Sequence, residues 1–328
     1  MSDRFIGLDV GGTKIALATL CDGKLSESTL METAIDDRDK LIDQLVDAVE
    51  QLRDGDVRAV GVGVPSVVDF ETGRIRASVN IPLEDVPLRE LLTERVGLPV
   101  FVDNDASCAA LAEAFEDGRF TCPDLVMFTI GTGVGGGTVL GGSLYRGATG
   151  AAPEIGHQII GLDLSDGDRS SEADVADFPQ PGSLESLASG KALDRLALDA
   201  ARRDPESFLG KRLAADGEVT GHDCVDGAKE GDESATRCLR ILGERLGIGI
   251  ANAINLYDPL EVVIGGGVST AGDLLLEPAN RVAFRHVLPG VGTRTKIRLA
   301  RHGPRAGVLG AALIAAQEWE PDPKEGGS

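Results

Sequence analysis

The sequence predicts an α/β protein of two domains, and three observations support this prediction. Strand-like apolar runs and helical repeats alternate through the first 120 residues, an order typical of a mixed or parallel sheet with helices. The second half restarts with the device that opens the chain, a strand, a glycine-rich turn and another strand. A length of 328 residues is enough for two domains. We expect domains at residues 1–120 and 121–304, with a C-terminal helix at 305–320 completing the first.

The opening device occupies residues 5–18, and its turn contains the residues Asp9, Gly11, Gly12, Thr13 and Lys14. Glycines at such a turn let backbone N–H groups approach a phosphate closely. The threonine and lysine add a hydroxyl donor and a positive charge, and the aspartate lies where it could hold a metal. The same pattern also fits an ordinary hairpin whose glycine pair only makes the turn.

Two further glycine turns follow strand-like runs. The first comprises Gly131, Thr132, Gly133, Gly135, Gly136 and Gly137, and the second comprises Gly265, Gly266 and Gly267. A flexible linker is the alternative for the first, but flexible linkers are not flanked by tight apolar strands. Neither a G-x-G-x-x-G opening a strand–helix unit nor a P-loop motif occurs. A nucleotide held between two domains by glycine turns therefore fits better than a simple dehydrogenase or a P-loop NTPase.

Apolar residues at helical spacing predict helices at residues 36–53, 88–96, 234–256 and 307–317. Residues 161–182 are acidic, rich in serine and poor in large apolar residues, which predicts an exposed excursion.

The chain is strongly acidic, with 53 Asp and Glu against 32 Lys and Arg and a net charge of −21. Nucleic acid is therefore not an expected partner, because binding phosphates along a backbone needs basic faces. The acidic excess is spread over the whole chain, and only 8 of the 32 basic residues are lysines. This composition resembles that of proteins from a high-salt cytoplasm, where salt screens self-repulsion.

If the composition is an adaptation to salt, the melting temperature will rise by several degrees from dilute buffer to molar KCl, because screening relieves repulsion among carboxylates. Thermal unfolding monitored by circular dichroism checks this expectation. Equal melting temperatures in the two solutions would contradict it.

No apolar run reaches 18 residues, so no membrane span is expected. The first strand begins within a few residues of Met1, which predicts no signal peptide. None of the five cysteines forms a C-x-x-C pair, as expected for reduced thiols. We therefore expect a cytoplasmic protein.

Asp105 is the strongest candidate for a general base, because it lies where a strand at 99–102 gives way to a helix. A carboxylate there could accept the proton of an attacking hydroxyl. The alternative is that Asn104 or Asp105 only caps the helix. Glu154 and His157 could bind a metal or a polar substrate, although a lone Glu-x-x-His pair is a weak signal. Composition alone gives Glu185 no functional claim.

Taken together, the motifs resemble one family, the ROK sugar kinases (repressor, ORF, kinase), and among them the glucokinases. The matching segments, in the order expected for the family, are 9–14 (DVGGTK), 61–65 (GVGVP), 103–106 (DNDA) with 109–113 (AALAE), 131–137 (GTGVGGG), 154–157 (EIGH), 182–185 (GSLE) with 188–190 (ASG), 258–259 (DP) with 262–268 (VVIGGGV), and 307–312 (GVLGAA). Each is weak alone, but their common order along nearly the whole chain is a strong signal.

The resemblance implies a two-domain actin-like ATPase (ribonuclease H-like) fold with the active site in the interdomain cleft. It also implies transfer of a phosphoryl group from ATP, with Mg²⁺, to the 6-hydroxyl of a hexose. By this resemblance Asp105 is the catalytic base, and it binds the sugar together with Asn104, Glu154, His157 and Glu185. The phosphate loops are then residues 7–14, beginning at Gly7, and residues 131–138. Gly265 to Gly267 lie under the adenosine, and Asp9 orients the metal through water.

The sequence departs from the family at one place. Many members carry a zinc site made of a histidine matching His157 and three cysteines shortly before the position of Glu185. Residues 158–185 contain no cysteine, so we expect no structural zinc and some other means of holding the His157 ring.

Other members of the family suggest alternatives. One is a kinase for fructose, mannose or an N-acetylhexosamine, and another is a glucokinase that uses polyphosphate. A sugar-responsive transcriptional regulator is disfavoured, because such regulators carry a helix-turn-helix domain ahead of the motif that starts here at Asp9. Members are commonly dimers or tetramers, so a homo-oligomer is expected.

Overall fold

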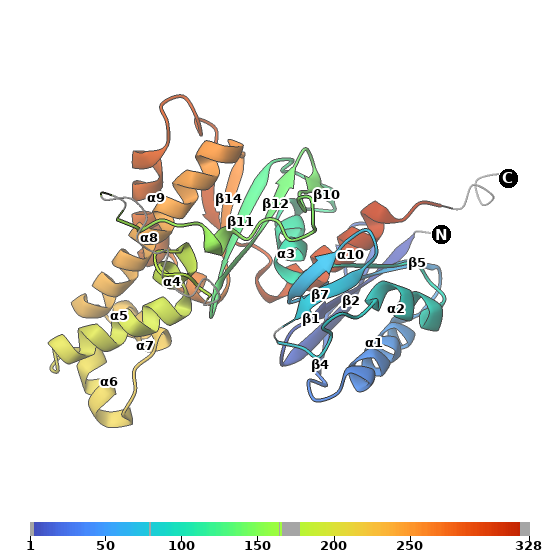
Figure 1. The fold of residues 1–328 in the computed structure, drawn as a ribbon, viewed down its shortest axis with the longest axis horizontal. Coiled ribbons are helices and arrows are strands. Elements are labelled where there is room, and N and C mark those ends of the chain that lie inside the picture. Colours follow the sequence, from blue (N-terminus) through green and yellow to red (C-terminus); the bar gives the residue numbers. More distant parts are fainter. Residues whose placement is uncertain (1–2, 79, 164, 166–177, 322–328) are drawn as a thin grey trace. The chain divides into compact units, whose positions relative to one another are not determined.

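The structure is a computed structural model that describes residues 3–78, 80–163, 165 and 178–321 (Figure 1). Much of the acidic excursion predicted at 161–182 lies outside these residues. The contacts divide the chain into two compact units. Unit 1 comprises Met1–Asp124, Gly137–Pro153 and Arg301–Ser328, and unit 2 comprises Leu125–Gly136 and Glu154–Ala300. The helix at the C-terminus thus belongs with the N-terminal segment, and residues 137–153 join unit 1 although the sequence boundaries place them in the second domain.

A mixed sheet forms the centre of unit 1. Its strands are β1 (Arg4–Val10), β2 (Lys14–Cys21), β3 (Lys24–Leu25), β4 (Thr29–Glu32), β5 (Val57–Val64) and β8 (Val100–Asn104). The order is β3-β2-β1-β5-β8, with β4 also paired to β2. Strand β1 pairs antiparallel with β2 and parallel with β5, which in turn pairs parallel with β8. The carboxyl ends of β1, β5 and β8 therefore meet at one edge of the sheet.

Short hairpins and helices complete unit 1. The hairpins are β6 (Ser66–Asp69) with β7 (Arg74–Ser78) and β9 (Phe115–Glu116) with β10 (Arg119–Phe120). The helices are α1 (Arg38–Leu52), α2 (Leu88–Val96), α3 (Asp105–Glu113) and α10 (Ala306–Glu318), the last preceded by the 3₁₀ turn η4 (Gly303–Arg305).

The two faces of this sheet differ because strand side chains alternate. Ile6 and Leu8 of β1 join a core with α1 and α2. Gly7 of the same strand faces α10, and Gly61 of β5 also faces α10, where side chains would overlap its backbone. The small residues therefore let α10, which is apolar and buried nearly all round, lie directly on the sheet. Asp9 and Asp103 follow the same alternation and lie on the α10 face.

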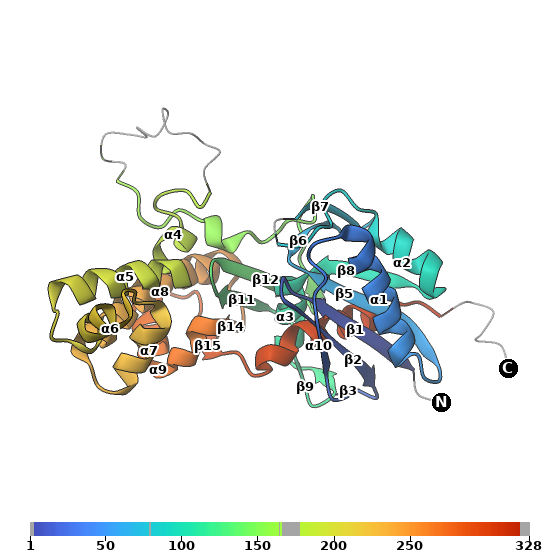
Figure 2. The ribbon, with the colours of Figure 1, turned by 90° about the horizontal axis from the view of Figure 1, so that it is seen from below.

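Unit 2 combines a sheet with a helical layer (Figure 2). The strands are β11 (Leu125–Ile130), β12 (Val134–Leu140), β14 (Glu261–Gly265) and β15 (Lys296–Leu299), in the order β12-β11-β14-β15. The chain enters unit 1 within β12, whose far end pairs with β13 (Ser143–Leu144). The helices are α4 (Leu184–Ala188), α5 (Gly190–Arg203), α6 (Phe208–Asp216), α7 (Gly221–Lys229), α8 (Glu233–Tyr257) and α9 (Asp273–His286), with 3₁₀ turns η1 (Ile155–His157) and η3 (Gly267–Ala271).

Within the described residues, no helix combines the length and the apolar character needed to cross a membrane. All five cysteines are described, and no disulfide joins any of them.

Candidate active site

Asp9 lies near the end of β1, and its carboxylate faces the beginning of α10. A Cβ at Gly307, the second residue of that helix, would overlap the carboxylate. Burial, and secondly repulsion from Asp105, raises the pKa of Asp9 to about 7. The two carboxylates therefore influence each other across the carboxyl edge of the unit 1 sheet.

Asn104 and Asp105 lie at the junction of β8 and α3. The sequence left open which of them caps the helix. Asn104 is the helix cap, since its Oδ1 accepts from the backbone N–H groups of Ala106 at 2.9 Å and Ser107 at 3.2 Å. Its Nδ2 donates to the carbonyl of Ser66 at 3.3 Å. Asp105 accepts the Ala106 N–H at 2.8 Å through Oδ1, and its own backbone and the Asn104 side chain also contribute hydrogen bonds that lower its pKa.

Burial raises the pKa of Asp105 to about 6, against the lowering effect of the Ala106 N–H bond. A carboxylate with such a pKa is ionised at neutral pH and is also a stronger base than an exposed aspartate. This combination suits a residue that must accept a proton from a hydroxyl.

These values predict an acid limb in the pH–rate profile. If one of these carboxylates acts as a base it must be deprotonated, so kcat/KM will fall about tenfold per pH unit below a midpoint between about 6 and 7. Initial rates from pH 5 to 9 in buffers of constant ionic strength measure this limb. A flat profile down to pH 5 would show that neither carboxylate limits the rate.

The turn between β1 and β2 is a tight hairpin, and this geometry is compatible with either interpretation of the opening motif. The N–H of Gly11 donates to the carbonyl of Lys14 at 2.9 Å. Thr33 fastens the turn from the side, through Oγ1 to the Gly11 carbonyl at 2.8 Å and through its N–H to the Thr13 carbonyl at 3.0 Å. The side chains of Thr13 and Lys14 are exposed, and they are available to a phosphate.

The glycine-rich segment of unit 2 is ordered by Glu185. Its Oε2 accepts the N–H of Val134 at 2.8 Å, and a Cβ at Gly133 would overlap the carboxylate. The N–H of Gly190 also donates to the carbonyl of Gly131 at 2.7 Å. Residues 131–133 form the turn itself, whereas the glycines at 135, 136 and 137 lie in β12. The segment is therefore a fastened strand–turn–strand and not a linker.

Glu154 precedes the 3₁₀ turn η1 in unit 2, and His157 is the last residue of that turn. His157 Nε2 lies 3.8 Å from Glu154 Oε2, and its ring meets Phe178 edge to face with centroids 5.3 Å apart. The buried Nδ1 has no hydrogen-bond partner among the described residues. Partial desolvation raises the pKa of Glu154, His157 opposes the rise, and Glu185 adds to it. The ring of His157 is therefore contacted by the aromatic ring of Phe178.

The third glycine turn follows β14. Gly265 ends the strand, Gly266 takes a positive φ of 83°, and η3 begins at Gly267. Ser269 closes the turn through its N–H to the Gly266 carbonyl at 3.1 Å.

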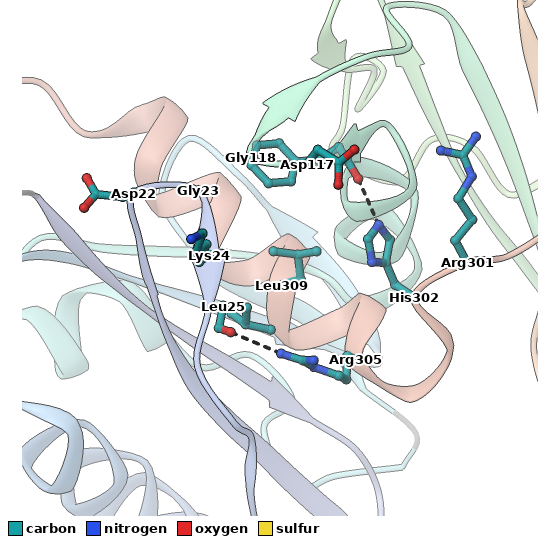
Figure 3. Close-up of a pocket in the computed structure, with 11 residues that line it drawn as sticks. Asp22, Gly23, Lys24, Leu25, Asp117, Gly118, Arg301, His302, Arg305 and Leu309 are labelled. Carbon is teal, nitrogen blue, oxygen red and sulfur yellow. Dashed lines mark hydrogen bonds between the residues drawn. The ribbon is translucent and has the colours of Figure 1, made fainter.

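A hollow of about 690 Å³ in unit 1 is lined by other residues. Figure 3 shows Arg305 donating to the Leu25 carbonyl and His302 bonded to the Phe115 carbonyl beside two hairpin turns, at Asp22 and Asp117. It contains none of the candidate site residues.

Comparison with known proteins decides the family. The model of the ROK family matches residues 5–318. The chain belongs to the ROK family. It is 35% identical to the glucokinase of Halalkalibacterium halodurans over 97% of both chains. It is 29% identical to the xylose repressor of Caldicellulosiruptor bescii, over 95% of this chain and 78% of that one.

Among solved structures, the ROK family glucokinase of Streptomyces griseus in complex with glucose and AMPPNP matches with a TM-score of 0.75 and 33% identity, covering 96% of this chain and 99% of that one. The predicted actin-like (ribonuclease H-like) fold class is thus confirmed, and this ROK protein is a sugar kinase.

The side chains of this ROK kinase are compatible with a Mg²⁺ site, because Mg²⁺ needs few protein ligands. Mg²⁺ is usually bound by one or two carboxylates together with substrate phosphates and waters. Asp9 offers one carboxylate at the edge of the sheet that carries Asp105, and none of the described residues donates a hydrogen bond to its oxygens. Within the described residues no group of three or more His, Cys, Asp or Glu side chains could form a cage for a metal ion.

Proposed function

We propose that this chain is an ATP-dependent glucokinase that converts glucose to glucose 6-phosphate. The observation that carries the proposal is Asp105, a carboxylate with a pKa raised to about 6 beside a helix-capping asparagine, in a chain 35% identical to a named glucokinase. A non-catalytic regulator has no need of a carboxylate tuned in this way. The solved relative that binds glucose and AMPPNP supports the same donor and acceptor here.

In the proposed reaction, Asp105 accepts the proton of the sugar 6-hydroxyl while that oxygen attacks the terminal phosphorus of ATP. Asn104 and, in unit 2, Glu154, His157 and Glu185 are proposed to bind sugar hydroxyls. Oε2 of Glu185 accepts the N–H of Val134, so Oε1 is the oxygen that we propose for a sugar hydroxyl. This double use would couple sugar binding to the order of the glycine turn.

The nucleotide is proposed to lie against the three glycine turns. Thr13 and Lys14 with the exposed tip of the first hairpin, and the turn at 131–133, would bind phosphates, while residues 265–267 would lie under the adenosine. Asp9 would hold Mg²⁺ through water, and the ion, when bound, neutralises charge on the phosphates.

A coupled assay with purified protein tests the proposal. The acceptors are glucose, fructose, mannose and N-acetylglucosamine, and the donors are ATP and polyphosphate, each with and without Mg²⁺. We expect the highest kcat/KM with glucose, ATP and Mg²⁺, as suits an enzyme of glycolysis in the cytoplasm. Preference for another hexose or for polyphosphate would replace the proposed substrate, and no turnover with any pair would favour a sugar-responsive regulator.

The absence of structural zinc, the salt adaptation and the homo-oligomeric state remain predictions. Metal analysis, melting in KCl and sedimentation test them separately from the assay.

A further inference from the structure

Arg146 is a side chain of unit 1 that the sequence motifs do not single out, yet it contacts three separate elements. Its Nε donates to Asp103 Oδ2 at 2.7 Å, and its side chain is 19% exposed. A terminal nitrogen donates to Oε1 of Glu318, the last residue of α10, at 3.3 Å. Its guanidinium lies 3.5 Å from the ring centroid of Phe70, next to the end of β6. These contacts hold the guanidinium in one place.

The partner of Arg146 lies directly before the candidate site residues. The side chain of Asp103 is 3% exposed, and its Oδ1 accepts the backbone N–H of Asn104 at 2.8 Å. Asn104 in turn caps α3, and Asp105 is the first residue of that helix. A continuous chain of hydrogen bonds thus runs from Arg146 through Asp103 to the backbone that carries both residues.

From this chain we infer that Arg146 is a positioning residue for the sugar site. Its ion pair holds the Asp103 carboxylate in place. That carboxylate in turn holds the backbone that orients the side chains of Asn104 and Asp105. The inference rests on the proposed roles of these two residues.

The electrostatics of Asp103 agree with such a role. Burial raises the pKa of Asp103, and the Arg146 guanidinium opposes that rise. A buried ion pair adds little net stability compared with apolar packing, but removing one partner leaves an uncompensated charge. Without Arg146, Asp103 must take up a proton or turn toward solvent, and either change disturbs the acceptor of the Asn104 N–H.

Arg146 lies in residues 137–153, the segment that packs with unit 1. This segment leaves β12 and carries Arg146 to the edge where β8 ends. Its contact with Glu318 also joins the carboxyl end of α10, whose first turn faces Asp9. Arg146 therefore supports the carboxyl edge of the sheet from a segment 43 residues away in sequence from Asp103.

Four variants test the inference: Arg146→Gln, Arg146→Lys, Asp103→Asn and the double variant Asp103→Asn/Arg146→Gln. For Arg146→Gln we expect kcat/KM for the hexose to fall about 10- to 100-fold, as for a small misplacement of reacting groups. KM for ATP stays within about twofold, because the partners of Arg146 are Asp103, Glu318 and Phe70 and none of them belongs to the glycine turns proposed for the nucleotide. Arg146→Lys recovers part of the activity as a point charge on Asp103. The double variant should lose less kcat/KM for the hexose than the two single variants combined. Each single variant leaves one partner of the ion pair charged and unpaired, and the double variant removes both charges.

Arg298→Gln is the matched control. Arg298 forms an ion pair of the same 2.7 Å length with Glu261 and is as buried as Arg146, at 18% against 19% exposed, but it joins β14 to β15 in unit 2. We expect this control to lower the melting temperature without a selective loss toward the hexose.

Hydrogen exchange of the substrate-free protein separates this inference from the proposed function. In Arg146→Gln the amides of residues 103–107 should exchange at least tenfold faster than in wild type, with peptides of unit 2 unchanged. Unchanged exchange there in Arg146→Gln, or in Asp103→Asn if the glutamine variant does not fold, would overturn the positioning role whatever the substrate is. The positioning role would also be overturned if Arg146→Gln lowered kcat/KM equally for the hexose and for ATP, and if Arg298→Gln lowered both by the same factor. If exchange accelerates but the wild type phosphorylates no hexose, the positioning stands and the proposed function fails.

Discussion

Asp105→Asn will lower kcat by about 10²- to 10⁴-fold while the protein still binds its sugar, because the amide cannot serve as the proposed base for the attacking hydroxyl. The substitution keeps the shape of the side chain and keeps an oxygen that can accept the Ala106 N–H. Asn104, which caps α3, is untouched. The loss should therefore appear in the chemical step and not in the fold.

Calorimetry with glucose and initial rates with saturating ATP separate binding from turnover in this variant. Asp117→Asn is the matched control, since Asp117 is exposed in a hairpin turn with a φ of 51°, a conformation that asparagine tolerates well. The control should retain full activity. Near wild-type turnover by Asp105→Asn would show that the base lies elsewhere.

The stability of Asp105→Asn gives a second check, and its sign follows from the pKa values. Burial raises the pKa of Asp105 from 3.8 to about 6, so ionisation costs folding free energy as pH rises through that range. An amide carries no such cost. The variant should melt at or above the wild-type temperature at pH 8, and this advantage should shrink toward pH 4. A variant that melts lower at pH 8 would indicate structural damage.

The local elements of the fold were predictable from sequence because their signals are local. The helical spacing at 36–53 and 234–256 corresponds to α1 and α8. Pairing between distant segments was not predictable in the same way. Nothing in the spacing of residues 137–153 indicates that they pack with unit 1, because this packing uses contacts to residues distant in sequence, such as those of Arg146 with Asp103 and Glu318.

The same limit applies to the candidate site. The sequence indicated Asp9 and Asp105 as chemistry-bearing residues, but it could not show their mutual repulsion, since 96 positions separate them in the chain. It also left capping open at Asn104 and Asp105, which only hydrogen-bond geometry distinguishes. Glu185 had no claim by composition, and its bond to Val134 depends on a turn folding back toward α4. Sequence thus identifies residue types and local turns, whereas pKa values and orientation depend on long-range packing.

Gly307→Ala is expected to lower kcat by about 10²-fold or more, because the added methyl group occupies the place of the Asp9 carboxylate. The helix cannot easily retreat, since α10 lies directly on the glycines of β1 and β5. Asp9 must therefore rotate away. Alanine is otherwise the better helix residue by up to about 1 kcal/mol, so the melting temperature should change little while activity is lost.

A double-mutant cycle shows whether this loss passes through Asp9. If Asp9 holds Mg²⁺ as proposed, Asp9→Asn alone should reduce the rate strongly and raise the Mg²⁺ concentration needed for half-maximal activity, because the ion would lose that carboxylate. If Gly307→Ala acts only by displacing Asp9, the double variant will be no slower than Asp9→Asn. Gln317→Ala, exposed near the other end of α10, controls for changes in the helix itself. Additive losses in the cycle, or a Gly307→Ala enzyme with wild-type rate and Mg²⁺ dependence, would contradict a role for this close approach in orienting Asp9.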